Sequence, residues 1–128
     1  MLFNKIHHIA IICSDYEKSK RFYVDVLGFE VLNETYRKAR KSYKLDLALH
    51  GDYLLELFTF PDAPKRMSRP EAQGLRHLAF EVDTIETIRE KLLEKGVAVE
   101  PIRTDVLSGK KFTFFPDPDG LPLEIYEK

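Results

Sequence analysis

The chain has 128 residues, of which 44% are hydrophobic and 32% charged, and its net charge is −1. This composition is typical of one compact globular domain and unlike that of a disordered chain. The near-neutral charge gives no reason to expect a nucleic-acid partner, and no apolar run approaches the ~20 residues of a membrane span. The single cysteine, Cys13, excludes an internal disulfide and favours the reducing cytoplasm, and no signal-peptide pattern precedes the first expected strand.

The first half of the chain carries the pattern of four strands and one helix. Short β-branched or alternating apolar runs predict strands at 6–13, 29–36, 43–49 and 53–60. A helix is expected from a cap at Ser14 or Asp15 through Leu27, because its apolar residues recur at helical spacing and Gly28 follows. The His-Gly-Asp sequence at 50–52 predicts the hairpin turn between the last two of these strands.

The second half repeats this order after a stretch rich in proline and charge, 61–74, which we interpret as a linker. Strands are expected at 75–82, 97–103, 111–115 and 121–126. A helix capped by Asp83 or Thr84 is expected to run through Lys95 and to end at Gly96. Turns at 108–109 and 116–120 separate the last three strands.

The two halves also match residue by residue. HHIAII at 7–12 corresponds to RHLAFE at 76–81, and GDYLLELF from 51 corresponds to DGLPLEIY from 119. These matches keep nearly the same spacing along the chain, which indicates an internal duplication. The sequence therefore predicts an α+β fold in a single domain, 1–128, made of two tandem βαβββ modules at about 5–60 and 75–127.

Two polar residue types recur at equivalent positions of the modules. His8 of the first module corresponds to His77 of the second, and Glu56 corresponds to Glu124. Each glutamate stands between aliphatic residues, where burial of a carboxylate is unfavourable unless it is paired or bound to a metal. Two imidazoles and two carboxylates suit a divalent transition ion with open coordination positions, which is typical of catalytic rather than structural sites. We therefore predict that His8, Glu56, His77 and Glu124 bind one metal ion.

Strand alternation predicts what surrounds this metal site, because residues two apart on a strand face the same side. Because neighbouring residues of a strand face opposite ways, only one of His7 and His8 can be the ligand, and the correspondence of His8 with His77 selects His8. The expected lining comprises Ala10, Ile12, Leu54, Phe58, Ala79, Glu81, Pro122 and Tyr126. The basic residues available to an anionic substrate are Arg37, Arg40, Arg76, Arg103 and Lys111, although each taken singly is more simply explained as solvated surface. We favour Phe58, Tyr126, Arg37 and Lys111 as substrate-binding residues.

Several motifs resemble those of glyoxalase I and the wider vicinal-oxygen-chelate superfamily. They are His8 with Asp15, FYVDVLGF at 22–29, HLAFEVD at 77–83 and FPDPDGLPLEIYE at 115–127. The resemblance covers essentially the whole chain and implies two curved mixed sheets around a metal cavity. It implies a homodimer that acts on a small molecule, with His8, Glu56, His77 and Glu124 as the metal ligands. Nickel or cobalt is the favoured ion for a chain of this length, and zinc, manganese or iron are the alternatives.

Glu56 separates the branches of this superfamily. Ring-cleaving dioxygenases and fosfomycin-modifying enzymes typically use two histidines and only the last-strand glutamate, whereas a ligand at Glu56 resembles the proton-transfer branch. In that branch the metal polarises two adjacent substrate oxygens and stabilises an enediolate, while Glu124 moves the proton and Glu56 is its symmetry mate. The resemblance implies a lyase or isomerase related to lactoylglutathione lyase. The alternatives are a non-haem iron dioxygenase and a ligand-binding resistance-type protein without turnover.

The chain departs from glyoxalase I at the residues that hold glutathione. That enzyme usually carries an arginine on the first strand after the ligand histidine, and an asparagine just after the fourth-strand glutamate. In this chain 9–12 read Ile-Ala-Ile-Ile and 57–60 read Leu-Phe-Thr-Phe. Because both polar groups are replaced by apolar ones, we expect a substrate other than the hemithioacetal of methylglyoxal and glutathione.

Overall fold

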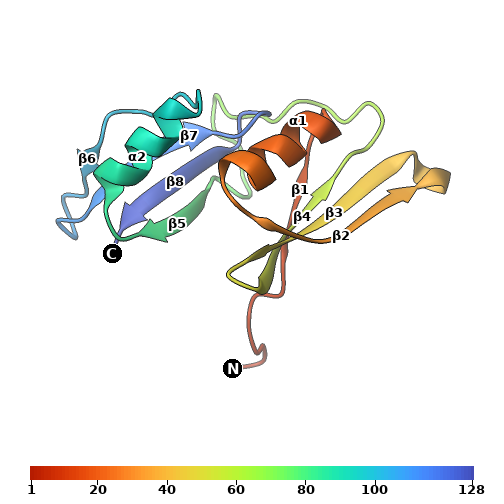
Figure 1. The fold of residues 1–128 in the computed structure, drawn as a ribbon, viewed down its shortest axis with the longest axis horizontal. Helices are drawn as coiled ribbons and strands as arrows, with labels where there is room; N and C mark the ends of the chain where they lie inside the picture. Colours follow the sequence, from red (N-terminus) through yellow and green to blue (C-terminus); the bar gives the residue numbers. More distant parts are fainter. The chain divides into compact units, whose positions relative to one another are not determined.

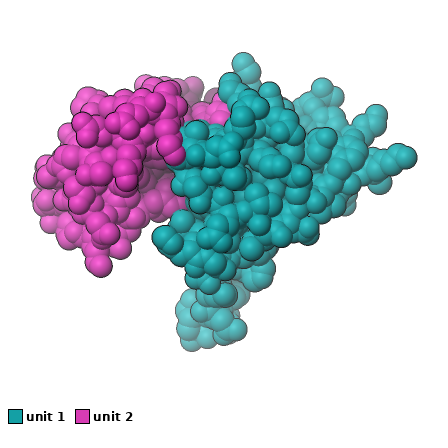
Figure 2. All heavy atoms as spheres, in the orientation of Figure 1, with its two compact units in different colours: residues 1–65 teal, residues 66–128 magenta.

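A computed structural model describes residues 1–128, which divide into two compact units, residues 1–65 and residues 66–128 (Figures 1 and 2). Each unit holds one four-stranded mixed sheet and one main helical segment, in the predicted order βαβββ. The α+β fold class is therefore confirmed. The boundary between the units falls inside the stretch 61–74, so residues 66–74 belong with the second unit. No helix reaches the length and apolarity that crossing a membrane requires.

The first unit is built on a sheet with the strand order β1-β4-β3-β2 (Figure 1). In this sheet β4 is antiparallel to β3, and β3 is antiparallel to β2, whereas β1 runs parallel to β4. Its elements are β1 (Ile9–Ile12), α1 (Tyr16–Lys20), the π-helical segment η1 (Arg21–Val26), β2 (Glu30–Arg37), the short 3₁₀ helix η2 (Lys38–Arg40), β3 (Ser42–Leu49) and β4 (Asp52–Phe58).

The second unit repeats this topology with the strand order β5-β8-β7-β6 (Figure 1). Here β5 runs parallel to β8, and the remaining pairs are antiparallel. Its elements are β5 (Leu78–Val82), α2 (Ile85–Glu94), β6 (Arg103–Thr104), β7 (Lys111–Pro116) and β8 (Pro122–Glu127).

The core of the first unit lies on one face of its sheet, because apolar residues alternate along β3 and β4. Leu45, Leu47, Leu55 and Leu57 are fully buried there, and each contributes about 1.5–3 kcal/mol relative to an exposed side chain. Tyr16 of α1 stacks on Tyr43 of β3 at 4.2 Å between ring centroids, so the helical segment packs on this face. The opposite face of the sheet is thereby left for other side chains. In the second unit, Leu123 and Ile125 are the corresponding buried residues of β8.

The first helix begins as predicted and ends differently. Asp15, rather than Ser14, is its cap, and its Oδ1 accepts a hydrogen bond from the Lys18 N–H at 3.1 Å. After Lys20 the turns widen, and the Leu27 N–H donates to the Phe22 carbonyl five residues back. The apolar spacing predicted a regular α-helix because so short a segment does not separate α from π turns. Gly28 then stops the helix with a φ of +86°.

The predicted strand at 97–103 is wrong over most of its length. Only Arg103–Thr104 pair with β7 as strand β6. Pro101 has no N–H to give to a ladder, and the Thr113 hydroxyl takes the place of a backbone donor. It donates to the Glu100 carbonyl at 2.8 Å, and the Pro101 carbonyl lies 3.3 Å away. The extended chain is therefore held by one backbone bond, from the Glu100 N–H to the Phe114 carbonyl at 3.0 Å, and by the side chains of Thr113 and Arg89. Periodicity does not reveal such side-chain contacts.

Two tight turns set the register of the strands that carry the glutamates. His50 and Gly51 have φ of +50° and +84° and form the two-residue hairpin loop between β3 and β4, as predicted. Before β8, Asp117 is buried, and its Oδ1 accepts hydrogen bonds from the N–H groups of Asp119 at 2.8 Å and Leu121 at 2.9 Å. This buried carboxylate fixes the start of β8 and thus the position of Glu124.

We expect the protein to be a homodimer in solution. The outer strand β2 exposes Val31, Leu32 and Tyr36, which are 44%, 50% and 52% accessible, so part of its apolar surface is left uncovered in the single chain. Light scattering at micromolar concentration should give twice the chain mass of 14.9 kDa. A mass of one chain, unchanged over a tenfold rise in concentration, would contradict this expectation.

Candidate metal centre

The first histidine–glutamate pair lies on the face of the first sheet that the helix leaves free. Glu56 pairs with Ala10 of β1 and with Asp46 of β3, and residues opposite each other in a sheet share a face. His8 precedes β1, and its Nε2 lies 3.8 Å from Oε1 of Glu56. Its ring stacks on Tyr53 at 5.2 Å between centroids. Glu56 is buried while His8 remains accessible, so a ligand can reach this carboxylate from the histidine side.

The second pair is closer. His77 precedes β5, and its Nε2 lies 2.9 Å from Oε2 of the buried Glu124. Glu124 pairs with Ala79 of β5 and with Phe114 of β7, so these three side chains share a face. The Phe114 ring meets the His77 ring edge-on at 5.1 Å. Nδ1 of His77 is buried and has no hydrogen-bond partner, so Glu124 is the one polar group that contacts this imidazole.

Each pair fits two adjacent ligands of a divalent ion. Two atoms bound at right angles to an ion at ~2.1 Å lie about 3 Å apart, close to the separation of the His77 and Glu124 atoms. The wider His8–Glu56 pair needs only a side-chain adjustment of a partly exposed histidine. Neither unit gathers three or more His, Cys, Asp or Glu side chains that could hold an ion by themselves. The four predicted ligands are therefore found as two pairs, one in each unit.

A polar network that sequence reasoning missed surrounds Glu56. The Tyr53 hydroxyl lies 2.8 Å from Oε2 of Glu56 and 2.7 Å from Oδ1 of Asp46. The Lys44 ammonium lies 2.8 Å from both oxygens of Asp46 and 3.4 Å from Glu56. Burial opposes ionisation of Asp46, but the hydrogen bonds from Lys44 and Tyr53 outweigh it and lower the pKa of this carboxyl. Burial, followed by the hydrogen bonds to Asp46 and Glu56, raises the pKa of Tyr53 above its ordinary value.

A β-bulge brings Tyr53 into this network. Leu47 pairs with Leu55, but the next residue of β3, Ala48, pairs with Tyr53, so Leu54 is an extra residue in β4. The bulge reverses the alternation on its far side and places Tyr53 on the face of Glu56. The prediction of Leu54 as a lining residue assumed an unbroken period of two. Tyr53 takes this place instead of Leu54.

The duplication itself explains why Asp46 was missed. Asp46 lies between leucines as Glu56 does, so the same criterion of a carboxylate in an aliphatic strand would have selected it. Its counterpart in the second module is Phe114, and the counterparts of Lys44 and Tyr53 are Phe112 and Leu121. A search for repeated polar residues passes over a network that only one module has. The two pairs consequently differ in surroundings: Glu56 is held by polar groups, and Glu124 faces aromatic rings.

The four predicted substrate-binding residues lie in different settings. Arg37 places its guanidinium 4.6 Å from the centre of the Phe58 ring and donates to the Ser42 hydroxyl at 2.9 Å. Ile12 pairs with Phe58, which places both on the Glu56 face. Tyr126 shares the Glu124 face, and its hydroxyl donates to Asp105 at 3.0 Å. Lys111 is bound to Glu86 of α2 at 2.6 Å and so lies toward the helix, away from Glu124.

The model of the Glyoxalase/Bleomycin resistance protein/Dioxygenase superfamily matches residues 5–125. The chain belongs to this superfamily. It is 66% identical to YwkD of Bacillus subtilis (strain 168), with 100% of both chains covered, and 58% identical to YaeR of Escherichia coli (strain K12), with 97% and 96% covered. The crystal structure of a glyoxalase family protein from Enterococcus faecalis superposes with a TM-score of 0.93 at 53% identity, covering 99% of this chain and 100% of that one.

More distant members of the superfamily differ in their chemistry. A manganese-dependent 2,3-dihydroxybiphenyl 1,2-dioxygenase of Geobacillus genomosp. 3 is 31% identical over 95% of this chain and 36% of its own length. A 2-epi-5-epi-valiolone epimerase of Actinomyces sp is 28% identical, with 94% and 77% covered. The metallothiol transferase FosB of Staphylococcus saprophyticus is 28% identical, with 98% and 78% covered. Membership in the superfamily therefore does not by itself specify the reaction.

Proposed function

We propose that this chain is a divalent-metal-dependent lyase or isomerase that moves a proton between adjacent carbons of a small oxygenated substrate. His8, Glu56, His77 and Glu124 are the proposed ligands, with nickel or cobalt favoured over zinc, manganese or iron. The observation that carries the proposal is the recurrence of a buried glutamate beside a histidine at equivalent positions of both units. Burial of a carboxylate is unfavourable unless it is paired or bound to a metal. The Glu124 carboxylate is paired with His77 alone, so this site in particular is suited to a cation.

The two glutamates are suited to different roles. A divalent ion, when bound, supplies the Lewis acidity that polarises adjacent substrate oxygens. Lys44 and Tyr53 hold the Glu56 carboxylate in place, so its freedom to turn toward a substrate carbon is small. Glu124 contacts His77 and otherwise faces aromatic side chains, which leaves one carboxylate oxygen available to take a proton from one carbon and return it to the next. We therefore assign Glu124 as the proton carrier and Glu56 as its counterpart on the metal.

One observation favours a second candidate, a non-haem iron dioxygenase with three protein ligands. Glu56 is already satisfied by Tyr53 at 2.8 Å, and it lies 3.8 Å from His8, farther than Glu124 lies from His77. In that case Glu56 is a structural member of the polar network rather than a ligand. The two candidates therefore differ in what Glu56 contributes to metal binding.

The variant Glu56→Gln distinguishes the proposed lyase or isomerase from the dioxygenase. Under the proposed function, Glu56→Gln should lower metal affinity at least tenfold, because a charged ligand becomes a neutral amide. Glu124→Gln should lower metal-dependent isomerase turnover per bound ion by ~10²–10⁴ through loss of the proton carrier. Elemental analysis and a proton-exchange assay by NMR would measure the two effects, with Glu90→Gln, an exposed residue of α2, as the control. Full metal content in Glu56→Gln together with oxygen uptake on a catechol would instead establish the dioxygenase.

A further inference from the structure

We infer that the arginine-lined cavity of the second unit binds an oxyanion of the substrate, a phosphate, phosphonate or carboxylate group, beside His77. Its role as a substrate site rests on the proposed function, whereas anion binding itself does not. The inference comes from the charge and the fixed geometry of the cavity walls. It narrows the substrate to a small molecule with an anionic group at one end and adjacent oxygens at the other.

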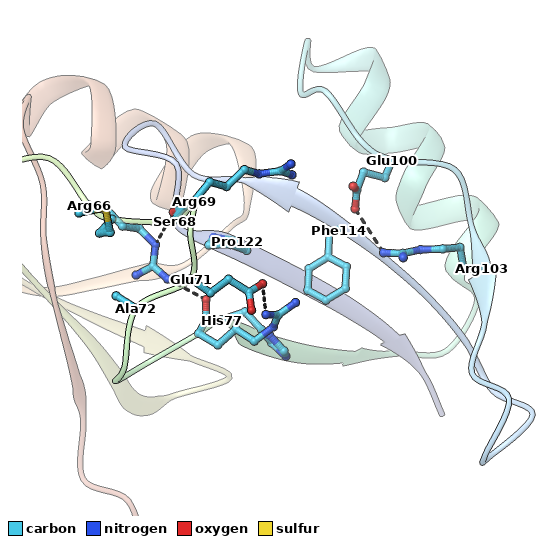
Figure 3. A pocket seen from close by; sticks show the side chains of 12 residues that line it. Arg66, Ser68, Arg69, Glu71, Ala72, His77, Glu100, Arg103, Phe114 and Pro122 are labelled. Carbon is cyan, nitrogen blue, oxygen red and sulfur yellow. Dashed lines mark hydrogen bonds and ion pairs between the residues drawn. The ribbon is translucent and has the colours of Figure 1, made fainter.

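The cavity has a volume of about 260 Å³ and a strongly cationic lining (Figure 3). His77 and Phe114 form part of its wall, so it opens beside the second histidine–glutamate pair. Its charged residues are Arg66, Arg69, Arg76, Arg103, Glu71 and Glu100. Four guanidinium groups against two carboxylates leave an excess of positive charge around a space large enough for a small anion.

Arg66 stabilises the wall of the cavity, and we do not assign it to ligand binding. Its side chain donates to the Ser68 hydroxyl at 3.0 Å and to the carbonyls of Leu75 at 3.0 Å and Arg76 at 2.9 Å. These bonds tie the segment that enters the unit to the segment that leads into β5. Arg76 is paired with Glu71, so its charge is compensated. The guanidinium groups that make no hydrogen bond and no short ion pair within the protein are therefore those of the other two arginines, Arg69 and Arg103.

Arg103 is held in place by aromatic rings. Its guanidinium lies 5.0 Å from the centre of the Phe112 ring and 5.7 Å from that of Phe114. It forms a long ion pair with the Glu100 carboxylate at 3.6 Å, which Figure 3 shows beside it. This ion pair compensates part of the charge of Arg103, but the distance is too long for a hydrogen bond, so its N–H groups stay available. A stacked guanidinium keeps its in-plane N–H groups free for an oxyanion, and the stacking reduces the entropy lost on binding. Because Phe114 also contacts His77, Arg103 sets a positive charge near the proposed ligand.

Arg69 is the second arginine of the cavity whose N–H groups are available to a ligand. It lines the cavity and makes no hydrogen bond or ion pair with the rest of the protein. Like charges that share one cavity repel, and a bound anion removes this repulsion while accepting two charge-assisted hydrogen bonds. The planar donors of two arginines match the oxygens of a phosphate or carboxylate, and a neutral ligand gains nothing from them. Arg69 and Arg103 are therefore the residues that we assign to the anion.

Anion binding by the full-length, metal-free protein tests this assignment. The probes are inorganic phosphate, acetate and the neutral acetamide, followed through backbone amide shifts in ¹H–¹⁵N NMR spectra. We expect saturable shifts at residues 66–77 with phosphate or acetate and none with acetamide. Arg69→Gln and Arg103→Gln should each weaken binding about tenfold or more, because each removes a charge-assisted hydrogen bond. Arg21→Gln, in the helical segment of the first unit, is the matched control and should bind as the parent does.

The result distinguishes the source of the anion and separates this inference from the proposed function. Tighter binding of phosphate than of acetate points to a phosphorylated or phosphonate substrate, and the reverse points to a carboxylate. Equal shifts with acetamide, or equal weakening in the Arg21→Gln control, would overturn the inference. Metal content is the second readout, because Arg69→Gln should keep the metal of the parent. A parent that binds phosphate here but no metal would end the proposed function and leave the anion site in place.

Discussion

Replacing His77 by alanine is expected to remove most of the metal bound to the protein. His77 Nε2 and Glu124 Oε2 lie 2.9 Å apart, so the variant loses one of two adjacent proposed ligand atoms and leaves the buried carboxylate without its partner. Loss of a group that only orients a metal ligand already weakens metal binding by ~10–100-fold. Loss of a ligand itself should therefore weaken binding by at least about 100-fold, or roughly 2.7 kcal/mol.

Elemental analysis of the purified protein would measure this effect. We expect about one divalent ion per chain in the parent and a small fraction of that in His77→Ala. His50→Ala is the matched control, because His50 is an exposed histidine of the β3–β4 turn and contacts neither pair. Metal content in His77→Ala equal to that of the parent would rule out the ligand assignment.

Mixing His8→Ala with His77→Ala would extend this test to the assembly. If each metal centre takes its two pairs from two chains, a mixed dimer contains one centre with both histidines intact and regains part of the bound metal. If both pairs come from one chain, the mixture stays as poor in metal as each variant alone.

Turnover of the glutathione hemithioacetal of methylglyoxal is expected to be weak or absent. Ile12 and Phe60 stand near the positions where the resemblance to glyoxalase I implies polar groups that hold glutathione, and both are partly exposed. Each charge-assisted hydrogen bond is worth ~1.5–3 kcal/mol, so loss of two weakens binding by roughly two orders of magnitude or more. A basic residue beside Phe60, Arg37, is already engaged by Ser42 and the rings of Phe58 and Phe60.

An isomerase assay with a series of thiol hemithioacetals would measure this difference. We expect a higher kcat/KM with a smaller or more apolar thiol adduct, or with an α-hydroxycarbonyl compound, than with the glutathione adduct. The metal-loaded protein should be used throughout, so that the comparison reports on the substrate alone. A kcat/KM for the glutathione adduct within the ordinary enzyme range of ~10⁴–10⁸ M⁻¹s⁻¹ would show that other residues hold glutathione.

The parts of the fold that the sequence predicted depend on patterns repeated in both halves. Alternating apolar residues, turn-forming residues and the near-constant spacing of the matched segments together indicated two βαβββ modules, and the structure has this order. The same repeat selected the two histidine–glutamate pairs, which the structure brings together within each unit. These features could be predicted because strand alternation and internal duplication are patterns of the amino-acid sequence itself.

Other features depend on contacts between residues that local patterns do not connect. The bulge at Leu54 turns Tyr53 to the Glu56 face, and the apolar periodicity of the sequence does not predict this bulge. The network of Lys44, Asp46 and Tyr53 occurs in one unit only, so the duplication concealed it. Arg69 lies in a stretch without secondary structure, and only the folded second unit gathers it into one cavity with His77 and Arg103. The sequence alone selected the two histidine–glutamate pairs because they recur at equivalent positions of both modules. Side-chain contacts across the sheets, and contacts made by residues 66–77, decided what surrounds these pairs.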